Sequence, residues 1–224
     1  MIASRITSIQ AGQPVTTGIP GSRDPMNRPF TSAIWKEPIP GPVTVTRNGI
    51  EGDTVANHRH HGGRDQALLA YASTHYAVWR AEWGTHDLAN GGFGENLTVD
   101  DADEHSVCIG DIWEAGPVRL EVTQPREPCA TLARRHGRAE LVRTLTANGR
   151  SGWYLRVLSG GTLSPGDVLT LSARPYPVWT IRRAALVRHG REGNQGDVEE
   201  LAGLSALGHR FRAALVHRLH ATQS

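Results

Sequence analysis

VRLEVTQPREPCATLARRHG, residues 118–137, joins a strand-like segment, a stiff turn and a short helical segment. Apolar and polar residues alternate over 118–123, which is the period-two pattern of a half-buried strand. Two prolines then restrain the backbone, and residues 130–136 have the composition of a short helix that stops at Gly137. The segment therefore predicts a strand that leads through a rigid turn to Cys129, at or near the start of a helix.

The same strand pattern recurs through the first 172 residues. Trp153, Leu155 and Val157 alternate with more polar neighbours, and Gly-Asp pairs at 110–111 and 166–167 each lead into an apolar run. Such pairs supply tight turns before strands. We expect a mostly β body with helices, a β-barrel or sandwich rather than a parallel α/β sheet.

One clear helix interrupts these strands. Ser73 is suited to its N-cap, and Tyr76, Trp79 and Trp83 fall on one face at helical spacing. We interpret this aromatic stripe as core packing rather than as a cofactor-binding feature.

The pattern changes after the proline-bearing connector at 173–178. Three helical segments are expected there, and Asp197 with Glu200 forms a D-x-x-E pattern that resembles a capping box. The sequence thus divides into a β domain, residues 1–172, and a C-terminal three-helix extension, residues 173–224.

Composition limits the function classes. The chain of 224 residues has no apolar run long enough to span a membrane, and its first residues lack the pattern of a secretory signal. We therefore expect a cytoplasmic protein without a membrane partner. The two cysteines imply no disulfide framework.

Arginine dominates the basic residues. Lys36 is the single lysine among 24 basic residues, and 22 acidic residues leave a net charge of +2. Guanidinium groups suit phosphate recognition, although a compositional bias is the simpler interpretation. The arginines are dispersed and no nucleic-acid-binding motif accompanies them, so no nucleic-acid partner is expected.

NHRHHGGRDQALLAY, residues 57–71, is rich in histidine and glycine. Its three clustered histidines are His58, His60 and His61. A zinc site needs three or four converging ligands, and no second cluster with metal-ligand spacing is visible, so zinc is not expected. Gly62 and Gly63 would let the backbone approach an anion closely, or would simply form a turn.

GGFGENLTV, residues 91–99, is a further glycine-rich stretch. It lacks the spacing and the following helix of a dinucleotide-binding fingerprint. The amide of Asn96 offers two donors and an acceptor, enough to hold a polar heterocycle. A simple turn residue is an equally good interpretation of Asn96.

Cys129 differs from the other cysteine. Arg126 precedes it and Arg134 and Arg135 follow, and such surroundings favour a thiolate that binds soft metals or attacks electrophiles. Cys108, in a strand-like run, fits a small buried hydrophobic residue.

Six motifs follow one another along the chain: GIEGD (49–53), HHGGRDQAL (60–68), FGENL (93–97), IGD (109–111), QPREPC (124–129) and SGWYLRVL (151–158). In this order they resemble the MOSC domain, named for the C-terminal domain of molybdenum cofactor sulfurase, and most resemble its YiiM-like branch. The resemblance covers nearly the whole chain, including a C-terminal three-helix extension.

The resemblance implies a MOSC-type β-barrel that binds a molybdopterin-type molybdenum cofactor, with Cys129 as the protein ligand to the metal. Pyridoxal phosphate is not expected. The residues carried over as cofactor contacts are His61, Gly62, Gly63, Asn96, Arg126 and Cys129. Two positions depart from the usual pattern: Arg64 replaces a proline, and Gln66 replaces a basic residue.

Relatives of this family reduce N-hydroxylated compounds such as hydroxylaminopurines and amidoximes. The resemblance therefore implies a molybdenum-dependent reductase of a small N-hydroxylated substrate, in which Cys129 holds the metal. Glu95 and His61 are candidates for the acid that protonates the leaving oxygen. An external electron-donor protein is expected, because two cysteines cannot ligate an iron–sulfur cluster.

Two other functions fit the same residues. The protein would be a carrier if it held the cofactor, or a persulfide on Cys129, without turnover of its own. It would be a cysteine hydrolase if Cys129 worked with a histidine such as His136. The oligomeric state and the role of the C-terminal helices are not indicated by the sequence.

Overall fold

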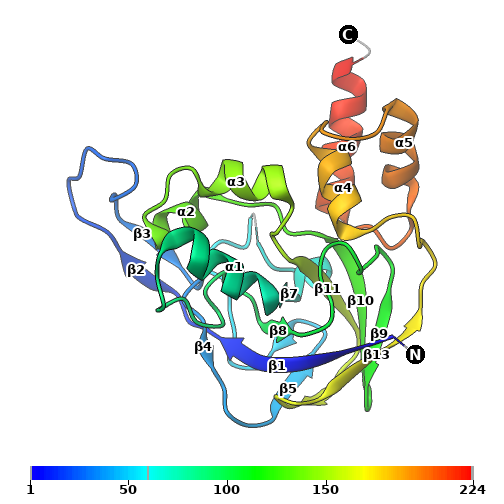
Figure 1. The fold of residues 1–224 in the computed structure, drawn as a ribbon, viewed down its shortest axis with the longest axis horizontal. Helices are drawn as coiled ribbons and strands as arrows, with labels where there is room; N and C mark the ends of the chain where they lie inside the picture. The colour runs from blue at the N-terminus through cyan, green and yellow to red at the C-terminus, as the bar shows by residue number, and fades with distance from the viewer. Residues whose placement is uncertain (1, 60, 223–224) are drawn as a thin grey trace.

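The structure, a computed structural model, describes residues 2–59 and 61–222 and is built around a closed β-barrel (Figure 1). Seven strands close it in the order β13-β9-β10-β11-β7-β8-β1, and β1 pairs back with β13. The barrel strands are β1 (Ala3–Ala11), β7 (Leu68–Ala72), β8 (Leu97–Val99), β9 (Ile112–Ala115), β10 (Val118–Pro125), β11 (Trp153–Ser159) and β13 (Val168–Ala173).

Shorter strands and the helices lie around the barrel. The short strands in the described chain are β2 (Val15–Thr17), β3 (Phe30–Ser32), β4 (Glu37–Pro38), β5 (Val43–Thr46), β6 (Gly49–Ile50) and β12 (Gly161–Leu163). The helices there are α1 (Thr74–Trp83), α2 (Ala130–His136), α3 (Leu141–Asn148), α4 (Ile181–Arg188), α5 (Gln195–Gly203) and α6 (His209–Thr222), with a 3₁₀ turn, η1, at Arg64–Gln66. The predicted fold class, a MOSC-type β-barrel followed by three helices, is confirmed.

The alternating pattern of residues 118–123 produces β10 as predicted. Val118, Leu120 and Val122 are fully buried and belong to the barrel core, while Arg119 between them is exposed. One pair of barrel strands, β7 and β8, is parallel, and α1 supplies the crossover that parallel strands require.

α1 begins where the sequence indicates, but its cap differs. Ser73 occupies the N-cap position without a capping hydrogen bond, and its hydroxyl donates to the Asp100 carboxylate instead. Tyr76 and Trp79 are buried in a second hydrophobic cluster and Trp83 packs against it, so the aromatic stripe is core, as predicted.

The expected three helices follow β13, but the capping box of α5 lies three residues earlier than predicted. Asn194 accepts from the Asp197 backbone at 3.1 Å, and the Asp197 carboxylate accepts from the Asn194 backbone at 2.8 Å. The prediction was wrong because the extended N-cap residue is Asn194, whereas Asp197 already stands in the first helical turn. Glu200 instead accepts from the Trp179 indole at 2.6 Å.

The three C-terminal helices form a group of their own beside β10 (Figure 1). The barrel core nevertheless continues without a break into this group, through residues such as Trp179, Ile181, Phe211 and Leu215. The division of the chain at 172/173 stays a prediction. No helix in the described part of the chain combines the length and apolar character needed to cross a membrane.

Candidate functional site

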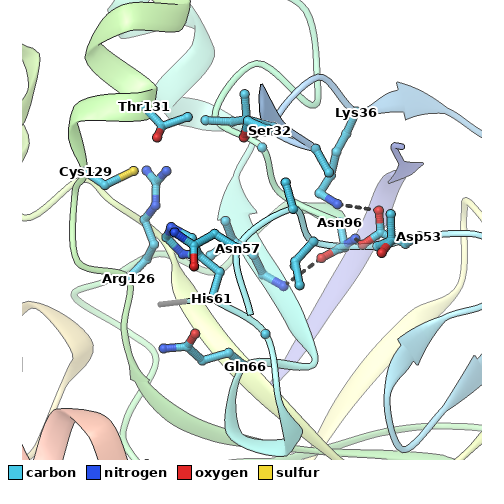
Figure 2. Close-up of a pocket in the computed structure, with 18 of the residues that line it drawn as sticks. Ser32, Lys36, Asp53, Asn57, His61, Gln66, Asn96, Arg126, Cys129 and Thr131 are labelled. Atoms are coloured by element: carbon cyan, nitrogen blue, oxygen red, sulfur yellow. Dashed lines mark hydrogen bonds and ion pairs between the residues drawn. The ribbon is translucent and has the colours of Figure 1, made fainter. Parts of the chain in front are cut away.

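A cavity of about 850 Å³, its open mouth included, gathers residues from distant parts of the chain (Figure 2). Five segments and Tyr154 line it: residues within 31–36, 53–57, 61–69, 93–96 and 126–131. Of the sequence-predicted residues, the cavity brings together His61, Gly62, Asn96, Arg126 and Cys129. Gly63 and Glu95 are outside its lining, and His60 lies outside the described residues.

Cys129 is the N-cap residue of α2. Its backbone is extended, with φ −127°, and its sulfur makes no capping hydrogen bond. The thiol is half-buried and lines the cavity. α2 runs over Ala130–His136 and ends at Gly137 in the left-handed conformation, as predicted. Cys108 is buried, as expected of a structural cysteine, and burial raises the pKa of its thiol.

Two of the three arginines expected around Cys129 are used elsewhere. The Arg134 guanidinium stacks on the Phe30 ring at 3.9 Å, and Arg135 donates to the backbone carbonyls of Ile34 and Gly91. Their helical positions carry them away from the N-terminus of α2. Only the upstream arginine, Arg126, lines the cavity with Cys129.

Arg126 is buried, with 5% of its surface exposed, and reaches toward the cavity (Figure 2). Its Nη1 has no hydrogen-bond partner among the described residues. A buried charged donor without a partner is costly, so this nitrogen is suited to an acceptor that enters the cavity.

The opposite wall carries a buried ion pair that the sequence analysis missed. The Lys36 ammonium pairs with the Asp53 carboxylate, which also accepts from Asn96 Nδ2 and from the backbone of Gly12, both at 2.8 Å. Burial lowers the pKa of Lys36, and the charge of Asp53 opposes this effect. The available signal was that Lys36 is the only lysine of an arginine-rich chain.

Asn96 connects segments of this wall through hydrogen bonds and is not a surface turn residue. Its Oδ1 accepts from the Leu69 backbone at 3.1 Å, and its Nδ2 donates to Gln10 O at 3.3 Å and to Asp53. Both N–H donors are therefore engaged inside the protein, and a ligand in the cavity would meet at most the remaining lone pair of Oδ1.

Glu95 sits behind the cavity wall and is fully buried. Its carboxylate accepts four hydrogen bonds, from the Tyr76 hydroxyl, Gly91 N at 2.7 Å, Phe93 N at 3.1 Å and Thr98 Oγ1 at 3.0 Å. This arrangement shapes the loop that carries Asn96. It gives Glu95 no route to a substrate in the cavity.

The glycines of the HGG motif allow a tight backbone path. Gly62 and Gly63 both have positive φ, 72° and 85°, which residues with a Cβ rarely adopt. A Cβ on Gly62 would also approach Val55 Cγ2 to 3.0 Å, so the chain could not pass this close with a larger residue. Gln66, one of the two departures from the usual pattern, lines the cavity and its buried Oε1 has no partner among the described residues.

His136 does not form a catalytic pair with Cys129. The two lie at opposite ends of α2, separated by roughly 10 Å of helical rise, and His136 does not line the cavity. Its Nε2 bonds to Gly92 O at 2.9 Å, and burial, aided by nearby arginines, lowers its pKa to about 4. The hydrolase interpretation with His136 as the partner of Cys129 has no support in this geometry.

The MOSC domain family matches residues 57–170, a span that contains the HGG loop, Asn96, Arg126 and Cys129. The chain belongs to the MOSC domain family.

Relatives of this MOSC protein extend the match. It is 33% identical over 213 residues to YflK of Bacillus subtilis (strain 168), covering 95% of this chain and 93% of that protein. It is 40% identical over 165 residues to a protein named Reductase from Gibberella moniliformis (strain M3125 / FGSC 7600), covering 72% of this chain but only 29% of that longer protein.

Among solved structures, YiiM from Geobacillus stearothermophilus has a TM-score of 0.79 and 31% identity, covering 96% of this chain and 99% of that one. The full-length agreement, helices included, assigns the protein to the YiiM-like branch.

Proposed function

We propose that this MOSC protein binds a molybdenum cofactor in the described cavity and reduces small N-hydroxylated compounds there. The observation that carries the proposal is that two groups line the same cavity: the half-buried thiol of Cys129, and the buried Nη1 of Arg126, which has no hydrogen-bond partner among the described residues. Family membership and a relative named as a reductase support it.

The residues of the cavity fit such a cofactor. A thiolate is a suitable ligand for a metal that also carries dithiolene sulfurs. Arg126 supplies a charged donor for an anionic group, and the positive-φ backbone at Gly62 leaves room for close approach. When bound, the cofactor would supply a metal centre that accepts the substrate oxygen and exchanges two electrons.

The chain's own residues would then bind and orient the substrate and supply its protons. The overall change, R–NHOH + 2e⁻ + 2H⁺ → R–NH₂ + H₂O, needs one proton at the leaving oxygen and one at the nitrogen. His61 lines the cavity and is the residue we assign to this transfer, directly or through water. We leave Glu95 out of this role because it lies outside the cavity lining and its carboxylate is fully hydrogen-bonded.

The electrons must come from outside the chain. Its two cysteines are too few for an iron–sulfur cluster, so we propose an external electron-donor protein. Both cysteines are free thiols, which fits a protein that works in the reducing cytoplasm.

The test compares wild type with Cys129→Ser and with the control Cys108→Ser, all made in a host that synthesises molybdenum cofactor. Molybdenum per chain and reduction of 6-hydroxylaminopurine with a chemical reductant are measured. We expect wild type and Cys108→Ser to hold molybdenum and turn over, and Cys129→Ser to lose both. Molybdenum without turnover in wild type would favour a cofactor carrier, and wild type without molybdenum would refute the proposal.

A further inference from the structure

The C-terminal helices touch the loop that carries the cavity residues His61 and Gly62. Asp65, in η1 just after this loop, accepts from His209 at the start of α6 twice: from its backbone N at 2.9 Å and from its ring Nδ1 at 2.8 Å. A carboxylate at this place compensates the unpaired N–H groups and the positive end of a helix. Asp65 thus caps a helix 144 residues away in sequence.

Asp65 also fastens the same loop to the barrel. Its Oδ1 accepts from Arg156 Nε at 2.9 Å and from Arg156 Nη2 at 2.7 Å, and its backbone carbonyl accepts from the Thr123 hydroxyl at 2.6 Å. Burial alone would raise the pKa of Asp65, but the hydrogen bonds from His209 and Arg156 outweigh this effect and lower the pKa to about 2, so it is a carboxylate at neutral pH. Three elements, β10, β11 and α6, therefore meet at one residue: β10 at its backbone carbonyl, and the other two at its carboxylate.

Two further contacts seat α6 against the cavity loops. Arg210 Nη2 donates to His58 O at 3.0 Å, within the histidine-rich loop. Gly208 packs so closely that a Cβ there would stand 2.2 Å from Gln124 Oε1, in the strand that leads to Arg126. On α4, Arg188 forms an ion pair with Glu127 of the P-R-E-P-C segment at 3.2 Å.

We infer that the C-terminal helical group is a positioning element of the cavity, and that Asp65 is the positioning residue through which α6 fixes loop residues 57–59 and 61–66. The three helices share the barrel core, and the inference adds to this shared packing a role at the cavity. It builds on the proposed function only in taking this cavity as the reaction site.

The first experiment needs no cofactor. Hydrogen exchange is followed at the amides of His61 and Gln66, which donate to Asn57 O and Gly63 O at 3.0 Å each. His209→Ala removes the ring bond to Asp65, whereas Gly208→Ala crowds the start of α6 against the Gln124 and Asp65 side chains while keeping every polar group. We expect both to speed exchange of these amides, His209→Ala by about fivefold, the effect of losing one hydrogen bond. The control Arg119→Ala breaks an exposed ion pair with Glu114 and should leave them unchanged.

The second experiment separates positioning from mere stability. In protein loaded with molybdenum cofactor, His209→Ala should raise KM for the N-hydroxylated substrate about fivefold with kcat per molybdenum within about twofold. His209→Asn, which keeps a side-chain donor, should restore KM. A lower melting temperature with unchanged loop exchange and unchanged KM would overturn the inference. If wild type binds no molybdenum, the proposed function fails, and the exchange result alone decides the role of α6.

Discussion

The two walls of the cavity are built on opposite principles. On the Lys36 wall every charged group has a partner, because Asp53 joins the ammonium, the Asn96 amide and the Gly12 backbone. On the Arg126 wall a buried guanidinium nitrogen has no partner among the described residues, and the neighbouring thiol makes no capping bond. The first wall is complete without a ligand, whereas the second is suited to receive one.

This difference separates residues that stabilise the fold from residues that are suited to bind a ligand. A satisfied polar network stabilises and orients, and removing one member leaves the others buried and unpaired. An unsatisfied group lowers the stability of the empty protein and gains its partner on binding. Mutations on the two walls should therefore have opposite effects on stability and on cofactor retention.

The largest effect is expected on the Lys36 wall. Asp53→Ala leaves a buried ammonium without its counter-charge and should cost about 3–5 kcal/mol of the free energy of unfolding. Urea unfolding measures this. The double variant Lys36→Met with Asp53→Asn removes both charges and should recover much of the loss. A loss below about 1 kcal/mol for Asp53→Ala would break the comparison, because the wall would then not depend on its ion pair.

An intermediate effect of the opposite kind is expected on the Arg126 wall. Arg126→Met keeps the length of the side chain and removes the guanidinium nitrogen that has no partner among the described residues, so the free energy of unfolding should change by less than about 1 kcal/mol. Cofactor retention, measured as molybdenum per chain after dialysis, should fall at least tenfold, about 1.4 kcal/mol.

Arg134→Met is the matched control for this prediction. Its guanidinium stacks on Phe30 outside the cavity, so retention should stay at the wild-type level. Equal retention in Arg126→Met and Arg134→Met would remove Arg126 from the proposed binding site.

The sequence predicted what depends on near neighbours. The alternation over residues 118–123 is sufficient for β10 because one face of that strand is buried, and Gly137 ends α2 because glycine readily adopts the left-handed conformation. α3, over Leu141–Asn148, was missed because it is short and carries two threonines, although Leu141 and Leu145, both buried, stand at the helical spacing i, i+4 and were a local signal for it.

The site was predictable only in part, for a similar reason. Motifs indicated Cys129, Arg126, His61 and Gly62, which the structure places around one cavity. Asp53 and Asn96 are 43 residues apart in sequence, and Asp65 and His209 are 144 apart. No local pattern indicates either contact. Whether the gathered residues bind the cofactor stays a prediction.

The effect that is smallest at neutral pH concerns His136, which links the two walls from behind. It ends α2, the helix that starts at Cys129, and bonds to Gly92 O in the loop that leads to Asn96. Because its pKa is lowered to about 4 from 6.5, the fold favours the neutral ring. The contribution of His136 to stability is complete above pH 6.5 and is lost as the pH falls toward 4, by about 2 kcal/mol at pH 5.

Urea midpoints between pH 7 and pH 4.5 measure this loss, and Asp65 contributes little to it because its own contribution to stability is lost only as the pH falls below the ordinary carboxyl pKa of 3.8 toward its folded pKa of about 2. His136→Gln keeps a donor for Gly92 O without a titrating ring, so its midpoint should depend less on pH than that of wild type. Identical slopes for the two proteins would show that His136 is not the link that acid breaks. A weaker pH dependence of the urea midpoint in His136→Gln, with cofactor retention at pH 5 preserved only in that variant, would show that the His136 ring keeps the two walls in their relative position.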